Sequence, residues 1–387
     1  MSFEHSSGKS AIAADDRSTQ FARSLLAQAD LGLDGVHPWD MYLCSEDVPR
    51  RALAQGNLGL GEAYMDGDWE CPQLDVFFTR LLRSGVTDQV NPLALLHHAL
   101  CARLFNRQTS RRAWAVGEQH YDLGNDFYAA MLDPRMTYTC GYWKHANDLA
   151  EAQEAKLDLI CRKLDLRPGM RVLDIGCGWG SFMGFAAERY GVECVGVTIS
   201  REQCQWAEER YKGLPLSFRL QDYRELDELD ERFDRIVSIG MFEHVGRKNY
   251  RTFMEVAARC LEDDGLMLLH TIGKNRRRDV PDRWIDKYIF PNGDLPSIGQ
   301  IGDAADGLLV VEDLHNFGAD YDRTLMAWYA NFEKHWPQFS KELGERFYRM
   351  WQYYLLSCAG AFRARDIQLW QWVLSRRGVQ GGYQRIS

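Results

Sequence analysis

The chain lacks the features that mark several special classes of protein. None of its apolar stretches is long enough to cross a bilayer, and its first residues, MSFEHSSGKSAIAADD, contain no apolar core of a secretion signal. Its ten cysteines form no CxxC pair and no metal-type spacing, and there is no internal repeat or low-complexity tract. These absences predict a cytoplasmic protein with reduced thiols and without a membrane span or a bound metal.

An excess of positive charge is also missing. The 46 lysines and arginines are outnumbered by 55 aspartates and glutamates, which gives a formal net charge of -9 at pH 7. This charge argues against a nucleic-acid-binding protein and provides no overall attraction to an anionic membrane. Two clusters could still make a local membrane contact, Arg107, Arg111 and Arg112 in one segment and Lys274, Arg276, Arg277 and Arg278 in another. Solvated loop charges are the alternative explanation for each cluster.

The sequence divides into two parts of different character, and its 387 residues leave room for two domains. Residues 1–105 are rich in helix and loop signals, residues 106–118 form a polar, basic linker, and residues 119–387 contain the strands. The first 17 residues are polar and lack periodicity, so they are expected to be disordered.

Helices are expected in the first part. Phe21, Leu25 and Leu26 are predicted to line one face of a helix, and apolar periodicity predicts two more helices, over Leu74–Leu82 and Leu93–Leu104.

From Leu157 onward the pattern changes to alternating helices and short apolar strands. Strands are expected over Arg171–Ile175, Cys194–Ile199, Leu216–Leu220, Arg235–Gly240 and Leu266–Thr271. Such alternation predicts an α/β fold, a parallel sheet covered by helices on both faces. An insertion at 273–297 interrupts it, and the chain ends with an apolar segment Leu308–Asp313, an aromatic-rich helix Thr324–Trp336 and a long apolar segment Phe347–Leu374.

The most informative segment is Asp174–Gly180, DIGCGWG, which joins an expected strand to an amphipathic stretch. Glycines permit positive φ angles and leave room for a ligand to approach the backbone, and the following helix offers unpaired amide groups. The G-x-G-x-G spacing is tighter than the dinucleotide motif, and no acidic residue ends the next strand, so a nicotinamide cofactor is disfavoured. The turn looks like motif I of the S-adenosylmethionine-dependent methyltransferases, and a structural tight turn is the alternative.

Polar residues follow the next two expected strands. Thr198, Ser200 and Gln203 lie where the second strand ends and a helix begins, so they could hydrogen-bond the ribose or methionine part of such a cofactor. Asp222, in LQDYREL, follows the third strand, where methyltransferases commonly place an acidic residue against the adenine amino group. A helix cap is the alternative for the Ser and Thr residues, and a turn cap is the alternative for Asp222.

Two ionisable residues are expected at the ends of neighbouring strands. Glu243, in GMFEHVG, comes just beyond the fourth strand, and His270 ends the fifth strand in LLHTIG. This carboxyl edge is where open α/β sheets place their sites. A satisfied buried group would explain either residue alone, whereas both together with the glycine turn favour a site.

Two cysteines and a set of aromatic residues are further candidates. Cys140 lies in the aromatic-rich segment His120–Trp143, and Cys358 lies in SCAGAFR, whose apolar character favours packing because a desolvated thiol stays protonated. The late aromatic residues fit either a core or the wall of a slot for an acyl chain, and they are Tyr321, Trp328, Tyr329, Trp336, Trp351, Tyr353 and Tyr354.

Together these segments resemble one family, the cyclopropane-fatty-acyl-phospholipid synthases and the related mycolic acid cyclopropane synthases. The match covers nearly the whole chain, in EQHYDLGNDFY, YTCGYW, VLDIGCGWG, VGVTIS, LQDYREL, RIVSIGMFEHVG, LLHTIG, KYIFPNG, NFGADYDRTLMAWY and CAGAFRARDIQLWQ. The amino-terminal LGLGEAYMDGDWE resembles the small helical domain of the bacterial phospholipid enzymes, which the mycolic enzymes lack. The resemblance implies a class I S-adenosylmethionine-dependent methyltransferase (Rossmann-like) domain preceded by a small, mainly helical amino-terminal domain.

The resemblance also implies a cofactor site. S-adenosylmethionine would be contacted by Tyr138, Thr139, Asp174, Gly176, Cys177, Gly178, Gly180, Thr198, Ser200, Gln203, Asp222 and Tyr223.

The implied reaction adds a methylene group to the cis double bond of an unsaturated phospholipid acyl chain. The double bond attacks the sulfonium methyl group, and the resulting carbocation must lose a proton from the new methyl group before the ring closes. The implied base is a bound bicarbonate, held by Cys140, Glu243, His270, Tyr321 and the backbone at Ile272. Cys358 matches a position considered as the family's active-site thiol, and it ranks second because this chemistry needs no covalent intermediate.

The implied partners are unsaturated membrane phospholipids, with the protein peripheral on the inner face of the membrane and homodimeric. Two other functions remain open: a fatty-acid methyltransferase that makes a methyl or methylene branch, and a lipid-binding or scaffold protein that retains the fold. The complete set Cys140, Glu243, His270 and Tyr321 counts against the second of these.

Overall fold

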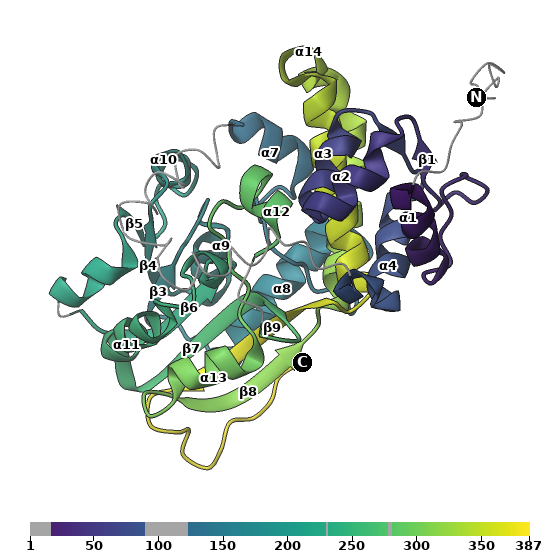
Figure 1. Cartoon of the computed structure of the whole chain (residues 1–387). Helices are drawn as coiled ribbons and strands as arrows, with labels where there is room; N and C mark the ends of the chain where they lie inside the picture. Colours follow the sequence, from purple (N-terminus) through teal and green to yellow (C-terminus); the bar gives the residue numbers. More distant parts are fainter. Residues whose placement is uncertain (1–16, 90–122, 230, 278–280) are drawn as a thin grey trace.

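The computed structural model describes residues 17–89, 123–229, 231–277 and 281–387. Figure 1 shows a large sheet with helices on both faces and a smaller group of helices beside the long helix α14 (Ala319–Arg363). Several sequence predictions lie outside the described residues. They are the disorder of residues 1–16, the helix Leu93–Leu104, the linker 106–118, the cluster Arg107, Arg111 and Arg112, and Arg278.

Residues 17–89 are mainly helical, as predicted. They contain α1 (Arg17–Ala27), β1 (Tyr42–Leu43), α2 (Asp47–Gln55), α3 (Asn57–Met65), β2 (Trp69–Glu70), α4 (Leu74–Ser84) and the 3-10 helix η1 (Val86–Gln89). The helix expected over Leu74–Leu82 is confirmed as α4. The predicted apolar face of α1 is wrong at one position, because Leu25 and Leu26 are buried whereas Phe21 is 49% exposed. The buried leucines lie in the second half of this helix, and its first half packs against less of the protein.

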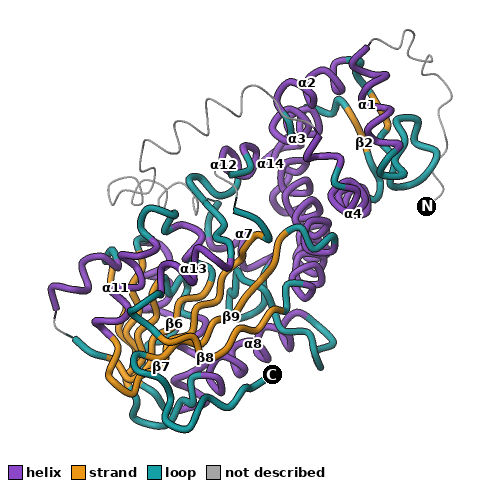
Figure 2. The backbone as a smooth tube through the Cα atoms, turned by 60° about the horizontal axis from the view of Figure 1, so that its bottom comes forward, coloured by secondary structure: helices purple, strands orange, loops and turns teal. Residues whose placement is uncertain are grey.

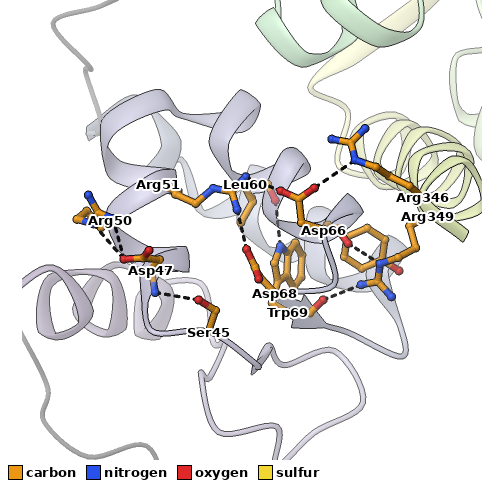
Figure 3. A network of polar contacts seen from close by, with 11 residues as sticks. Ser45, Asp47, Arg50, Arg51, Leu60, Asp66, Asp68, Trp69, Arg346 and Arg349 are labelled. Carbon is orange, nitrogen blue, oxygen red and sulfur yellow. Dashed lines mark hydrogen bonds and ion pairs between the residues drawn. The ribbon is translucent and has the colours of Figure 1, made fainter.

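An arginine-rich set of contacts joins α14 to the amino-terminal helices. Arg349 donates to the carbonyl oxygen of Trp69 at 2.9 Å and pairs with Glu70 at 2.8 Å, and Arg346 pairs with Asp66 at 3.2 Å. Figure 3 shows both arginines reaching toward the loop after α3, where Asp66 is also held by Arg51.

Close backbone packing holds α4 against α14. A Cβ atom at Gly360 of α14 would lie 2.6 Å from Phe78 Cβ and 2.7 Å from the carbonyl oxygen of Asp75, so glycine allows the two helices to touch. Arg363 then pairs with Asp75 of α4 at 2.6 Å and with Asp322 of α14 at 2.8 Å. The amino-terminal helices are therefore packed directly on the helix that carries Tyr321.

The second part contains a seven-stranded sheet with the order β5-β4-β3-β6-β7-β9-β8. Its strands are β3 (Arg171–Ile175), β4 (Glu193–Thr198), β5 (Leu216–Leu220), β6 (Phe233–Ile239), β7 (Leu261–Lys274), β8 (Val310–Asn316) and β9 (Ile367–Ser375). The five predicted strands are confirmed, with shifted ends for three of them. The five predicted strands are parallel to one another, as expected, whereas β9, which was not predicted as a strand, pairs antiparallel with both β7 and β8.

Helices cover both faces of this sheet, as predicted. Neighbouring residues of one strand enter different cores: Val172 of β3 packs with α8 (Leu149–Lys163) and α9 (Ser181–Tyr190), whereas Leu173 packs with α11 (Tyr250–Cys260) and α13 (Ile298–Ala305). This alternation follows from the two-residue period of a strand. Figure 2 shows the strands as one continuous twisted layer. The remaining helices are α7 (Asn125–Met131), α10 (Arg201–Arg210), η2 (Tyr223–Leu229), η3 (Phe242–His244) and α12 (Arg283–Tyr288).

The C-terminal third differs most from expectation. The helix predicted at Thr324–Trp336 extends over Ala319–Arg363, with a kink at Gly344, where φ is +73°. The apolar segment Phe347–Leu374 divides into the end of α14 and strand β9, which enters the sheet between β7 and β8. None of the helices in the described parts of the chain is long and apolar enough to span a bilayer.

Candidate active site

The glycine turn after β3 leaves open space beside one of its residues. Gly176, Gly178 and Gly180 all have positive φ, of +86°, +54° and +74°. A Cβ atom at Gly180 would lie 2.8 Å from the Phe218 ring, so this glycine allows α9 to pack. Apart from its chain neighbours, a Cβ at Gly178 would have one described residue within 4 Å, Gln203, whose side-chain nitrogen would lie 4.0 Å away. Gly178 therefore faces a space that a ligand can enter.

Two carboxylates, one at the end of β3 and one after β5, have a buried oxygen without a hydrogen-bond partner among the described residues. Asp174 is 2% exposed, its Oδ1 has no partner, and burial raises its pKa to about 7. Asp222 accepts from the backbone N–H and the Nε of Arg224 through Oδ1, each at 3.0 Å, while Oδ2 has no partner. The turn-cap explanation of Asp222 is thus correct for one oxygen, and the other oxygen is available to a ligand. The buried hydroxyl of Tyr223 also lacks a partner there.

The residues after β4 serve partly as a helix cap. The backbone N–H of Gln203 donates to Ser200 Oγ at 3.4 Å, so Ser200 caps α10, and the Ser200 N–H donates to Thr198 Oγ1 at 3.2 Å. The helix-cap explanation is therefore confirmed for Ser200, whereas Thr198 ends β4 and holds the Ser200 backbone. Gln203 lies beside Gly178 and lines the cavity described below.

His270 does not end its strand, which corrects the prediction. Pairing with β9 continues β7 to Lys274, four residues further, because Ile272, Gly273 and Lys274 pair with Leu369, Gln368 and Ile367. His270 nevertheless pairs with Ile239, the last residue of β6, so it lies level with the carboxyl end of that strand. Glu243 follows on η3, just past the same end.

Glu243 and His270 each present one buried atom without a hydrogen-bond partner in the described part of the chain. Glu243 Oε1 accepts from the backbone N–H of Ile272 at 2.6 Å, while Oε2 has no partner. Burial raises the pKa of Glu243 to about 7. Gln371 Nε2 lies 3.2 Å from His270 Nδ1, and His270 Nε2 has no partner. Burial also lowers the pKa of His270 well below its usual value, so its ring is neutral. In this orientation the Gln371 Nε2–H group donates to His270 Nδ1. The proton of the neutral His270 ring is therefore on Nε2.

The backbone N–H of Ile272 is used to hold Glu243. The neighbouring predicted residues are held by α8 and α14. Thr139 is fixed from α8, whose Gln153 side chain donates to the Thr139 carbonyl oxygen at 2.7 Å. The Tyr138 hydroxyl donates to the Tyr354 hydroxyl at 2.9 Å, and the ring of Tyr321 packs 4.5 Å from that of Phe362.

One large cavity, of about 1850 Å³, is lined by some of these groups. Eleven of the predicted residues line it: Tyr138, Thr139, Asp174, Gly176, Cys177, Gly178, Gln203, Glu243, Ile272, Tyr321 and Cys358. Seven lie outside its lining: Cys140, Gly180, Thr198, Ser200, Asp222, Tyr223 and His270. The cavity continues to apolar side chains of the amino-terminal helices, among them Leu25, Leu26, Leu58, Phe77, Phe78 and Leu81. It is therefore long, polar at the sheet edge and apolar toward the amino-terminal part.

Metal-binding groups are not found in the part of the chain that the structure describes, where no three His, Cys, Asp or Glu side chains converge on one point.

A family model named mycolic acid cyclopropane synthetase matches residues 108–372, well over half of the chain. The chain belongs to this cyclopropane synthase family. A cyclopropane-fatty-acyl-phospholipid synthase of Escherichia coli strain K12 is 54% identical over 374 residues, which cover 95% of this chain and 96% of that protein.

Two solved structures of cyclopropane synthases are similar to this chain. The cyclopropane synthase MmaA2 from Mycobacterium tuberculosis superposes with a TM-score of 0.64 at 33% identity, and covers 68% of this chain and 98% of its own. The mycolic acid cyclopropane synthase CmaA1, solved in complex with SAH and CTAB, gives a TM-score of 0.62 at 36% identity, covering 68% and 98%. The predicted class I S-adenosylmethionine-dependent methyltransferase fold is therefore confirmed.

The cavity of this cyclopropane synthase family member fits S-adenosylmethionine. The cofactor carries amino, hydroxyl and adenine N–H donors. Among the described residues, a buried acceptor without a partner is present at Asp174, beside the open glycine turn, and another at Asp222, after β5. Each such buried acceptor costs free energy until a donor arrives. The site can therefore hold S-adenosylmethionine, which is the methyl donor.

Two residues of the site were missed by sequence reasoning. Lys156 lies on the buried face of α8, is 0% exposed and lines the cavity, and Gln371 of β9 contacts His270. A signal for Lys156 was present, since it follows the buried Leu149, Ala152 and Gln153 at helical spacing. No signal pointed to Gln371, because its contact depends on the antiparallel pairing of β9.

The two candidate thiols are in different surroundings. Cys358 lines the cavity, and burial raises its pKa to about 12, so the protonated thiol is a weak nucleophile. Cys140 is 0% exposed, its Sγ–H donates to the Gly141 carbonyl oxygen at 3.2 Å, and burial raises its pKa.

We predict that Cys358→Ser keeps turnover within about threefold of the wild type, whereas Cys140→Ser lowers it by about tenfold or more through displacement of neighbouring Thr139. Steady-state rates with unsaturated phospholipid vesicles, with thermal unfolding as the folding check, measure both. The reverse order of the two losses would make Cys358 the leading catalytic thiol.

Proposed function

We propose that the protein transfers a methylene group from S-adenosylmethionine to the cis double bond of unsaturated phospholipid acyl chains, with bound bicarbonate as the base. The observation that carries this proposal is a group of buried polar atoms at one edge of the sheet that have no hydrogen-bond partner in the described parts of the chain: Asp174 Oδ1, Asp222 Oδ2, Glu243 Oε2 and His270 Nε2, with Tyr223 Oη nearby. They divide between a cofactor end and a base end.

Asp174, Gly178, Gln203 and Asp222 would hold S-adenosylmethionine. When bound, the cofactor supplies an electrophilic methyl group, and S-adenosylhomocysteine remains after transfer. The alkene supplies the electron pair for the new carbon–carbon bond, one proton leaves the transferred carbon, and closure of the ring consumes the positive charge. The CmaA1 relative was solved with SAH, which supports this assignment.

The base end needs a small, enclosed proton acceptor, because water would trap a carbocation. His270 Nε2–H would donate to one bicarbonate oxygen, and Glu243 Oε2 would share a proton with another. A fully ionised Glu243 would repel the anion, so the raised pKa of Glu243, about 7, suits a shared proton. Because the Ile272 N–H is taken by Glu243, we propose that Ile272 positions this carboxyl rather than the anion itself.

The cavity and the extent of the matches to relatives favour phospholipid as the substrate class. The apolar part of the cavity reaches α1, α3 and α4. The mycolic acid cyclopropane synthase CmaA1 matches 68% of the chain, whereas the cyclopropane-fatty-acyl-phospholipid synthase of E. coli matches 95% of it. Basic residues also line the cavity, where they would attract lipid phosphate: Arg83, Lys274, Arg276, Arg277, Arg283 and Arg365. We therefore propose peripheral binding to the inner face of the membrane. The homodimer implied by the resemblance stays a prediction.

The test is incubation of the purified protein with trideuteromethyl S-adenosylmethionine and vesicles of a cis-monounsaturated phospholipid. We expect acyl chains that gain one carbon and two deuterium atoms, with no gain on vesicles of saturated phospholipid. Retention of two deuterium atoms means that one was lost to a base, and proton NMR of the unlabelled product then distinguishes a ring methylene from a vinyl group.

A second candidate function is a fatty-acid methyltransferase, because a probable fatty acid methyltransferase of Pseudomonas putida is 36% identical over 65% of the chain. Three retained deuterium atoms would indicate a methyl branch, and vinyl signals would indicate a methylene branch. Either result would replace the cyclopropane proposal, and lipid binding without transfer would leave only a lipid-binding protein.

A further inference from the structure

Lys156 is a fully buried lysine in the cavity wall, and the function proposed above gives it no role. It lies on α8 and is 0% exposed, and its Nζ donates to Thr139 Oγ1 at 2.8 Å. Thr139 is in turn held by Gln153, one turn earlier on α8. The ammonium group is thus fixed beside the cofactor end of the cavity. A buried ammonium is costly where an apolar residue would fit, so its presence calls for a function.

Titratable groups from several elements surround this ammonium. They are Asp133 after α7, Cys140 before α8, Asp174 of β3 and His270 of β7. Burial lowers the pKa of Lys156 to about 8, while Asp133, Cys140 and Asp174 act in the opposite direction, so the group is mainly protonated at neutral pH. His270 is neutral and contributes no charge.

A neighbouring positive charge favours the ionised form of Asp174. Burial raises the pKa of Asp174 to about 7, and the positive charge of Lys156 counteracts this rise. The other titratable groups that face Asp174 are Cys177 and Cys194, whose pKa values burial raises, so both are neutral thiols. Without Lys156, Asp174 would be mostly protonated at neutral pH.

We propose that Lys156 is a positioning residue that keeps Asp174 ionised, so that the carboxylate can bind the positively charged amino group on the methionine part of S-adenosylmethionine. Asp174 and Lys156 both line the cavity, and Asp174 Oδ1 has no partner among the described residues, as such a binding role requires. This inference rests on the proposed function, because it takes the cofactor to lie in this cavity.

The test compares Lys156→Met with Lys163→Met. Lys163 is a matched control: it lies seven residues later on the same helix, is also 0% exposed and has its pKa lowered to about 8, but it faces His315 and Asp313 and does not line the cavity. Calorimetry measures the affinity for S-adenosylhomocysteine, which cannot react, from about pH 6.5 to about pH 9. The ratio of variant to wild-type affinity at each pH cancels the ionisation of the ligand itself.

We expect Lys156→Met to weaken binding by about 10- to 100-fold near pH 6.5, and this loss to shrink to within about threefold by pH 9. The loss shrinks because Asp174 ionises unaided at high pH and because the wild-type amine itself loses its proton above about pH 8. Lys163→Met should stay within about threefold of the wild type at every pH. A wild-type protein that does not bind would overturn the proposed function. A wild type that binds while Lys156→Met binds equally, or shows the same loss at every pH, would overturn this inference alone.

Thermal unfolding without ligand gives a second readout and checks folding. The folded-state pKa of Lys156 lies below its usual value of 10.5, so the unfolded state binds more protons between about pH 8 and pH 10.5. The wild type should therefore gain stability with pH over this window through Lys156. Lys156→Met should lack this gain and remain folded at pH 7, because methionine fills the same apolar space without a charge. An identical pH dependence in wild type and variant would contradict the buried, charged state on which the inference depends.

Discussion

Gly178→Val is expected to weaken binding of S-adenosylmethionine by about 100-fold or more while the protein stays folded. The φ angle of Gly178 is +54°, a region that a β-branched residue adopts only with strain. The added side chain would also point into open space, since the Gln203 side chain, 4.0 Å from an added Cβ, is the one neighbour within that distance. The valine would thus fill the room that the ligand needs and would displace little of the protein.

Gly213→Val is the matched control for this prediction. Gly213 has a φ of +96°, no atom within 4 Å of an added Cβ, and no place in the cavity lining. Both substitutions should lower the free energy of unfolding by about 1 to 3 kcal/mol through backbone strain. Calorimetry should find normal cofactor affinity in Gly213→Val only. If both variants bind normally, the glycine turn is not part of the cofactor site.

Glu243→Gln is expected to lower kcat by about 100-fold or more while leaving the affinity for S-adenosylmethionine within about threefold. The amide oxygen can still accept from the Ile272 N–H, which Glu243 Oε1 does at 2.6 Å, so the side chain should keep its place. An amide cannot take up a proton from the neighbouring anion, so the proton affinity of the base falls. Stripping dissolved carbon dioxide at constant pH should slow the wild type, and added bicarbonate should restore it, whereas the variant should respond little.

The stability of Glu243→Gln without ligand checks the state of this carboxyl group. Burial raises the folded-state pKa of Glu243 from 4.5 to about 7, so the stability associated with its protonated form is present below about pH 4.5 and is lost as pH rises through about 7. Glutamine does not ionise, so the variant should be more stable than the wild type above pH 7, by about 1 to 3 kcal/mol, and similar to it near pH 4. If the wild-type rate does not depend on bicarbonate in an enzyme free of residual anion, Glu243 or His270 is the direct base.

Local patterns in the sequence predicted much of the fold. Apolar runs such as Leu216–Leu220 became strands at the expected places, and the Asp174–Gly180 segment became a turn with three positive φ angles. These features depend on side chains a few residues apart, through strand and helix periodicity and through the conformational freedom of glycine. The same local segments carried the family resemblance that the comparisons then confirmed.

The place of β9 was not predictable in this way. Its residues Ile367–Ser375 are as apolar as a buried helix, and only pairing with β7, about a hundred residues earlier, makes them a strand of reversed direction. That pairing also extends β7 beyond His270 and brings Gln371 against its ring. Sequence reasoning therefore placed His270 at the correct edge but at the wrong point in its strand.

The sequence by itself determined the five parallel strands, the glycines that turn the chain and the family that the protein resembles, because short-range sterics and periodicity govern each of these. The tertiary structure alone decided which groups became partners. It placed the ammonium of Lys156 in the cavity wall with Asp174, tied Glu243 to the Ile272 N–H and left Oε2 and His270 Nε2 without partners in the described residues. These outcomes depend on burial and on contacts between distant segments, since the pKa of a carboxyl group reflects the water that packing removes and the charges that packing brings near it.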